Sequence, residues 1–390
     1  MEPDDSQTLW ESAAITNEQT LAFVLWAIDS GLCATEADFR HHFADDISLN
    51  DAIRWLIDFD YLGLDHDQVT LTPRGQAVVE RLRTTPTLAE EVRLTQSIAS
   101  FRATLQAIRR EDAPGTWGGV LDNLGVALSK LARVQTTTAI SARMELLAEA
   151  ITSHRETLRI FTFEDHPTRW ATVQHHLGLA LLAQGQLKLA YEGSNDETND
   201  ETNDETNDET NDETNDETND ETMAAIEAAL AAFRAAQRIY TRAEHPQFWA
   251  KLQNNLGVTL AEWAKAKQGD EERDERNDLL QQAADAYRQA LQIRSREAQP
   301  LEWATTRYNL ALVLHAQAHA DMLSDMSGAR ERLLDEAMQG YKSAAEVFVH
   351  DISRTRHDMA LHNLALLEEE VFGKRRRTAP RNTSYLDAHY

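Results

Sequence analysis

The stretch PQFWAKLQNNLGVTL, residues 246–260, decides the fold because the chain repeats its pattern at nearly regular intervals. Related stretches begin at Pro114, Pro167 and Pro300, and a fifth at Arg354 keeps the end of the pattern without the proline and tryptophan. The intervals between successive starts are 53, 79, 54 and 54. A recurring pattern of this kind is the signature of a repeat protein, in which each repeat is one structural unit.

The long second interval contains a low-complexity insertion. Residues 195–222 are seven copies of Asn-Asp-Glu-Thr, and without them the interval becomes 51, close to the others. We therefore expect the tract in the loop between the two helices of one repeat, disordered or loosely helical. Long surface insertions cost little, because loop entropy grows only logarithmically with length. A functionally silent expansion is favoured over a weak cation-binding or spacer segment.

A second pattern, Ala-x3-aromatic-x2-Ala, recurs between these stretches with the same intervals. Small, aromatic and small residues at i, i+4 and i+7 form one stripe of a helix, with a bulky side chain between two holes. The first pattern also predicts a helix, because proline suits the first helical turn. Glycine or alanine after its leucine lets the second helix approach closely. Each repeat is therefore expected to be a helix pair that is completed by stacking on its neighbours. The aromatic positions are Phe233, Tyr287 and Tyr341, with weaker versions at Phe101 and His154.

These patterns resemble the tetratricopeptide repeat family. The resemblance implies an all-α fold, a right-handed solenoid of helix pairs spanning 87–372. The repeat interval here is 53–54, whereas the family's unit has about 34 residues. We therefore expect longer helices, with charged loops inside the pairs such as residues 267–278. The resemblance rests on Leu124-Gly125, Leu177-Gly178, Leu256-Gly257, Leu310-Ala311 and Leu364-Ala365.

Residues 15–86 do not fit the repeat and predict a small separate domain behind a flexible N-terminus of residues 1–14. Helical patterns over 17–31, 35–45 and 48–64 precede a hairpin over 64–75, which turns at His66 and Asp67. This order resembles the winged helix-turn-helix domain, whose third helix would read DNA. Between Thr16 and Arg83, however, twelve Asp and Glu face five Arg and no Lys. Because basic contacts to phosphate supply most nonspecific DNA affinity, a protein contact is favoured over DNA binding.

The sequence offers no enzyme motif and no cofactor site. It has no glycine-rich phosphate loop, no nucleophile elbow and no cysteine-based metal motif. His315 and His319 are one helical turn apart on a predicted helix with Asp321 nearby, a spacing that could hold a metal. Solvated histidines on a helix face are the commoner case, so no metal site is predicted. The protein is expected to be non-enzymatic.

Composition and charge indicate a cytoplasmic protein without membrane contact. The net charge is −27, of which the tract contributes −14, and an acidic chain repels nucleic acid and anionic membranes. Cys33 is the single cysteine, so a disulfide framework is excluded and a reducing compartment is expected. The acidic N-terminus lacks the apolar core of a signal peptide. Residues 373–390 are expected to form a flexible tail that holds the basic cluster KRRRTAPR.

The position before each Leu-Gly or Leu-Ala supplies the candidate partner-binding residues. In some tetratricopeptide proteins this resemblance implies a ladder of asparagines along the concave face. A primary amide both donates and accepts hydrogen bonds, so it can hold a peptide backbone without reading side chains. The alternative is that these amides only bridge adjacent helices, and both interpretations stay open. The five ladder positions are Asn123, His176, Asn255, Asn309 and Asn363. On the same face the resemblance places Asp122, His175, Lys251, Asn254, Tyr308 and His362.

These features together predict a scaffold or adaptor that binds a peptide or protein partner in the groove of the solenoid. The alternative is a transcription regulator, in which the solenoid senses a ligand and controls DNA binding by the N-terminal domain. DNA is therefore a possible but less favoured partner.

Overall fold

The structure is a computed structural model that describes residues 56–57, 61–65, 68–76, 86–135, 138–199, 208–267, 269, 271–319, 327–349 and 354–378. The chain forms two compact units, Met1–Ile160 and Phe161–Tyr390.

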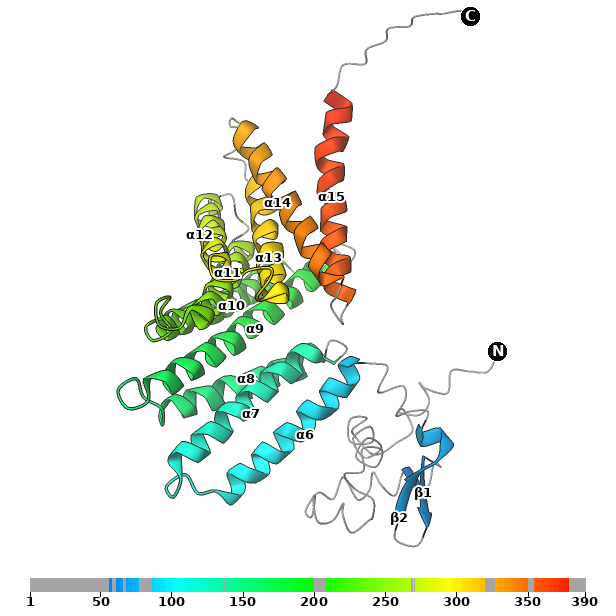
Figure 1. Cartoon of the computed structure of the whole chain (residues 1–390), viewed down its shortest axis with the longest axis vertical. Coiled ribbons are helices and arrows are strands. Elements are labelled where there is room, and N and C mark those ends of the chain that lie inside the picture. The colour runs from blue at the N-terminus through cyan, green and yellow to red at the C-terminus, as the bar shows by residue number, and fades with distance from the viewer. Residues whose placement is uncertain are drawn as a thin grey trace, which may run out of the picture. The chain divides into compact units, whose positions relative to one another are not determined.

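The second unit is a stack of helices in which each helix packs against the next along the chain (Figure 1). Antiparallel pairs are formed by α9 with α10, α11 with α12, and α13 with α14, and α15 packs on the last pair. This arrangement confirms the predicted all-α solenoid. The bounds are α9 (Pro167–Asn199), α10 (Asp208–Gln237), α11 (Pro246–Ala266), α12 (Arg273–Leu291), α13 (Pro300–Ala318), α14 (Ser327–Phe348) and α15 (Arg354–Thr378).

The described residues of the first unit include a β-hairpin and, from residue 86 onward, three long helices that follow one another along the chain. Strands β1 (Leu62–Asp65) and β2 (Gln68–Leu71) are antiparallel, with Leu62 opposite Leu71 and Asp65 opposite Gln68. The predicted strands on either side of residues 66–67 are thereby confirmed. Of the three helices predicted before the hairpin, only residues 56–57 and 61–64 lie within the described part of the chain. Residues 56–57 are helical, whereas 62–64 belong to β1. Helices α6 (Pro86–Ala107), α7 (Pro114–Val134) and α8 (Ile140–Leu158) follow the hairpin in the described part of this unit.

Proline begins the first helix of each complete repeat, as the sequence predicts. Pro114, Pro167, Pro246 and Pro300 are the first residues of α7, α9, α11 and α13. The residues before three of them adopt non-helical backbone angles, with φ between −135° and −145° at Ala113, His245 and Gln299. Proline has a fixed φ that suits a helix start, and the amide it lacks would have no partner inside the helix.

The glycine of each first helix receives the aromatic side chain of the second. A Cβ added at Gly125, Gly178 or Gly257 would lie 2.7 Å from a ring atom of His154, Phe233 or Tyr287 respectively. Three of the pairs therefore use one contact, in which a ring occupies the space that a glycine leaves. In the fourth pair the first helix carries Ala311 in place of the glycine. The glycine is Gly340 on α14, where an added Cβ would lie 2.8 Å from the Cβ of Ala311.

The described residues of the Asn-Asp-Glu-Thr tract are helical, which agrees with the loosely helical form of the prediction and shortens the loop between the two helices. Helix α9 extends into it as far as Asn199, and α10 begins within it at Asp208. Gly178 and Phe233 are joined by a much longer stretch of chain than Gly257 and Tyr287 in the next pair, yet each glycine meets its ring in the same way. The insertion therefore lengthens both helices of its pair. Its repeat of Asn-Asp-Glu-Thr is close to the helical period, and glutamate is a good helix former.

Two other charged segments are more helical than expected. The predicted loop 267–278 is helical from Arg273 onward, and α15 continues through 373–378, the start of the predicted flexible tail. Asp274 and Glu275 lie in the first turn of α12, where negative charge interacts favourably with the helix dipole. Lys and Arg are good helix formers, and their charge is favourable at a helix C-terminus.

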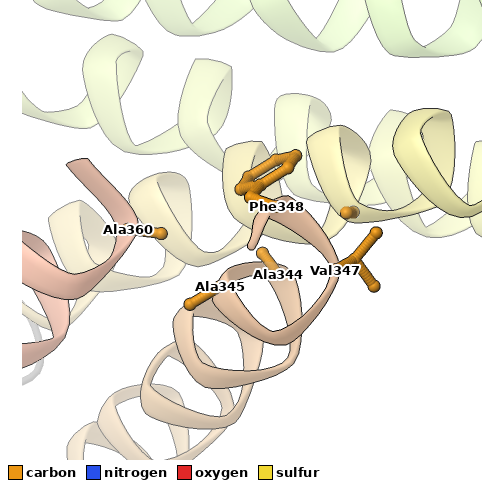
Figure 2. Packing of buried hydrophobic residues seen from close by; sticks show 6 residues of the cluster. Ala344, Ala345, Val347, Phe348 and Ala360 are labelled. Carbon is orange, nitrogen blue, oxygen red and sulfur yellow. The ribbon is translucent and has the colours of Figure 1, made fainter. Parts of the chain in front are cut away.

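The end of the second unit is held by a core of small residues around one ring. Phe348 of α14 is buried with Ala344, Ala345 and Val347 of the same helix, and with Ala304 of α13 and Ala360 of α15 (Figure 2). Trp303 and Tyr308 pack on this cluster from α13. Burying one side chain of this size contributes about 1.5–3 kcal/mol. The cluster fixes α15 on the last helix pair and so positions the candidate residues on α13 and α15.

Candidate functional site

The five ladder positions lie on the first helices of the repeats, α7, α9, α11, α13 and α15. Asn123 is on α7, in the first unit, and is exposed. The remaining positions are in the second unit and are partly buried, as His176, Asn255, Asn309 and Asn363.

Two of the ladder amides in the second unit reach the preceding first helix. Asn255 Nδ2 lies 3.0 Å from Nε2 of His175, so the amide can donate to the unprotonated ring nitrogen. Asn363 Nδ2 donates to the hydroxyl of Tyr308 at 2.8 Å. In both cases the partner occupies the position before the ladder residue of its own helix. The same contact therefore joins α9 to α11 and α13 to α15.

The step from α11 to α13 uses a different, buried bridge. Thr306 donates through Oγ1 to Asn254 Oδ1 at 3.0 Å. Arg294, only 8% exposed, donates through Nη1 to the same hydroxyl at 2.6 Å and to the carbonyl of Glu302 at 3.3 Å. Burial is the main cause that lowers the pKa of Arg294. Every polar partner in this bridge comes from the chain itself, which is what burial of such groups requires.

The candidates differ in how open they are to a partner. His175 and Asn254 are buried, while Tyr308 is half-buried and burial raises the pKa of its hydroxyl. Lys251 and His362 are exposed. Among the residues that the structure describes, Asn309 and His362 have no hydrogen-bond partner. Asn255 and Asn363 therefore bridge adjacent helices. The polar groups of Asn309 and His362 are the ones available to bind a partner.

In the first unit, Asp122 of the predicted set forms a buried contact inside its own helix pair. Its Oδ1 lies 2.9 Å from Nδ1 of His154, which is fully buried on α8. This contact holds the histidine ring over Gly125 on the same helix. Asp122 is therefore part of the packing between α7 and α8.

An aliphatic side chain accompanies each ladder position, a feature that the sequence interpretation missed. One turn after Asn255, Asn309 and Asn363 stand Val258, Leu312 and Leu366. Residues at i and i+3 are neighbours on a helix surface. We call these six residues the amide strip. Val258 is partly buried, whereas Leu312 is 40% and Leu366 is 49% exposed. The signal was present in the repeat pattern, as a recurrent aliphatic after Leu-Gly or Leu-Ala.

Among the residues that the structure describes, no helix has both the length and the apolar character of a membrane span.

Comparison with known proteins finds similarity only at the level of structure. No model of a protein family matches the chain, and no curated protein matches it. Among solved structures the chain is similar to a "Circular tandem repeat protein with novel repeat topology and enhanced subunit contact surfaces". The identity is 16%, the match covers 92% of this chain and 79% of that chain, and the TM-score is 0.35.

Proposed function

We propose that this protein is a non-enzymatic scaffold that binds an extended peptide segment of a partner protein along the amide strip. The repeats are tetratricopeptide-like helix pairs in a right-handed solenoid, and residues 15–86, with the hairpin β1–β2, form a winged-helix-like domain. The proposal rests on one observation. Three successive first helices of the second unit, α11, α13 and α15, carry an amide and, one turn later, an aliphatic side chain that is most exposed on α13 and α15.

The chemistry of the strip suits an extended peptide. Asn309 offers both a donor and an acceptor to a peptide backbone. Leu312 on α13 and Leu366 on α15 are exposed and offer apolar surface to alternate side chains of the same peptide. His362 is a neighbour of Leu366 on α15 and adds a polar group to the same helix. The bridges from His175 to Asn255 and from Tyr308 to Asn363 hold the helices in a fixed spacing.

A displayed library of random peptides, selected on the purified full-length chain, tests this function. The enriched sequence is synthesised with a fluorophore, and its affinity is measured by anisotropy. We expect Asn309→Ala and Leu312→Ser each to weaken binding by about tenfold, the loss of one hydrogen bond or one apolar contact. The matched control is Val349→Ser, at an aliphatic residue just after α14 that is 58% exposed and outside the strip.

Two outcomes would overturn the proposal. One is that no peptide is enriched on the chain, and the other is that enriched peptides bind both strip variants as tightly as the wild type. The DNA-binding alternative is tested on the same preparation with duplex DNA at two salt concentrations. It predicts an affinity that falls steeply with salt.

A further inference from the structure

Two histidines of α13 and one glutamate of α15 converge at the end of the second unit. His315 lies on α13 and His319 caps its C-terminus one turn later, so their side chains share a face of the helix. Glu370 is far beyond them in the sequence, and the stacking of α13, α14 and α15 brings it to them. Its Oε2 lies 3.3 Å from Nε2 of His315 and 3.0 Å from Nε2 of His319.

The distances fit a shared metal ion. The three donor atoms all lie within 4.8 Å of one another. Zinc bonds to imidazole nitrogen and carboxylate oxygen are about 2.0–2.2 Å long, so tetrahedral geometry separates neighbouring donors by roughly 3.3–3.6 Å. The two distances to Glu370 are close to that range. Imidazole and carboxylate are also the donor types that zinc takes in proteins, and three protein ligands leave the fourth position to water.

A fourth residue orients the carboxylate. Arg330 of α14 donates through Nη2 to Oε1 of Glu370 at 2.6 Å, which leaves Oε2 directed at the histidines. The Arg330 side chain is itself fixed, since its Nε donates to the carbonyl of Ala318 at the end of α13 at 2.8 Å. Hydrogen bonds of this kind, to a metal-ligating carboxylate from outside the site, are typical of protein metal centres.

The burial of the three side chains is graded. The Glu370 side chain is 17% exposed and that of His315 is 23% exposed, whereas that of His319 is 50% exposed. An ion can therefore enter on the His319 side and be held by the two more buried groups. The two histidines belong to α13 and its C-cap and the glutamate is on α15, so a bound ion would join the first helix of the last complete pair to the terminal helix.

We propose that His315, His319 and Glu370 bind a divalent first-row transition metal ion, with zinc the best fit, which fastens α15 to the solenoid. Metal binding at these three residues requires no peptide on the amide strip, although His315 and Glu370 are each one turn from a leucine of the strip. Without a metal, the same three side chains would form only a hydrogen-bonded contact between α13 and α15. A metal site predicts that added zinc binds the chain and raises its Tm, whereas a hydrogen-bonded contact predicts neither effect.

The test uses the full-length chain, freed of metal with a chelator and then dialysed. Zinc chloride is titrated by calorimetry, and Co²⁺ replaces zinc for visible absorption, which reports coordination directly. We expect wild type to bind zinc, to gain a higher Tm, and to give the intense absorption of tetrahedral cobalt. His319→Gln and Glu370→Gln should weaken zinc binding by more than tenfold and abolish that absorption. His357→Gln, at a histidine of α15 outside the site, is the matched control and should behave as wild type.

Circular dichroism of the metal-free variants checks that they fold, and the half-exposed position of His319 makes His319→Gln the decisive variant. The proposal is overturned if wild type binds no zinc. It is equally overturned if His319→Gln and Glu370→Gln, both folded, bind zinc and cobalt as wild type does, because the ion would then be held elsewhere on this acidic chain.

Discussion

Gly125 and His154 are in contact so close that even a methyl group between them would require a shift. A Cβ on Gly125 would lie 2.7 Å from Cε1 of His154, whose ring is fully buried and bonded to Asp122. The same relationship joins Gly178 to Phe233 in the second unit. In these pairs the spacing between the two helices is thus set by a missing side chain on one and a ring on the other.

This relationship predicts opposite effects for two glycines of α7. Gly125→Ala should destabilise the first unit by about 1–3 kcal/mol, the usual cost of overpacking a core. Gly119→Ala should stabilise it by about 0.5–1 kcal/mol, because a Cβ there meets no atom within 4 Å and alanine is the better helix former. Urea unfolding followed by circular dichroism measures both. Equal effects of the two substitutions would show that the ring does not set the helix spacing.

The buried bridge between α11 and α13 predicts a stability loss without a change of side-chain volume. Thr306→Val removes the hydroxyl that bonds Asn254 and Arg294, and leaving buried polar groups unsatisfied costs about 1–3 kcal/mol. Thr305→Val is the matched control, because its hydroxyl makes only exposed contacts, to Leu301 and Arg356. Thermal unfolding of both variants gives the comparison. A control that is as unstable as Thr306→Val would contradict the role of the bridge.

Most of the Asn-Asp-Glu-Thr tract should be dispensable for the fold of the second unit. Deleting residues 195–218, six of the seven copies, would leave Gly178 and Phe233 only one position further apart in sequence than Gly257 and Tyr287. This deletion should preserve the Tm of the second unit. Deleting all seven copies should lower it, because the connection becomes shorter than in the next pair and Thr222, which is fully buried, is lost. Calorimetric scans of the two deletions decide, and two equal Tm values would refute the expectation.

The orienting role of Arg330 predicts a change in zinc affinity for a residue that is not a ligand. Arg330→Lys keeps the charge but loses the fork that bonds both Glu370 and Ala318. Zinc should bind roughly tenfold more weakly, a typical effect of losing such a supporting group. Arg332→Lys, at a nearby position of α14 and bonded to Gly328, serves as the control. Calorimetric titration of zinc into both variants and wild type measures the affinities. An unchanged zinc affinity of Arg330→Lys would exclude the orienting role.

Local signals in the sequence were sufficient for the helix starts and for the packing inside the pairs. Proline at a first turn and glycine opposite a ring act over short distances, and the structure places Pro246 and Gly257 as these rules require. In the α13–α14 pair the glycine is Gly340 on the second helix and not a residue of the first helix. This is harder to foresee, because the glycine that permits close packing can lie on either helix of a pair. Charged segments were misjudged for a physical reason. Polar composition alone predicts a loop, although glutamate, lysine and arginine are good helix formers.

The candidate site was predictable only in part. The spacing of Asn255 and Asn363 placed them on the first helices, but whether an amide bridges or faces outward depends on the side chain it meets on another helix. Binding of a partner by these residues stays a prediction. Glu370 could not have been assigned to His315 and His319 from spacing, because α14 lies between them in the sequence and the contact exists only once α15 packs on the last pair.

The length of the α9–α10 helix pair can change in steps of one four-residue copy of the tract. One copy of Asn-Asp-Glu-Thr occupies about 6 Å of helix, so each added pair of copies, one in α9 and one in α10, would lengthen each of these helices by that amount. The other helix pairs would keep their packing, since their own contacts are unaltered. Gain or loss of copies would then give proteins with the same helix packing elsewhere and an acidic helix pair of graded length.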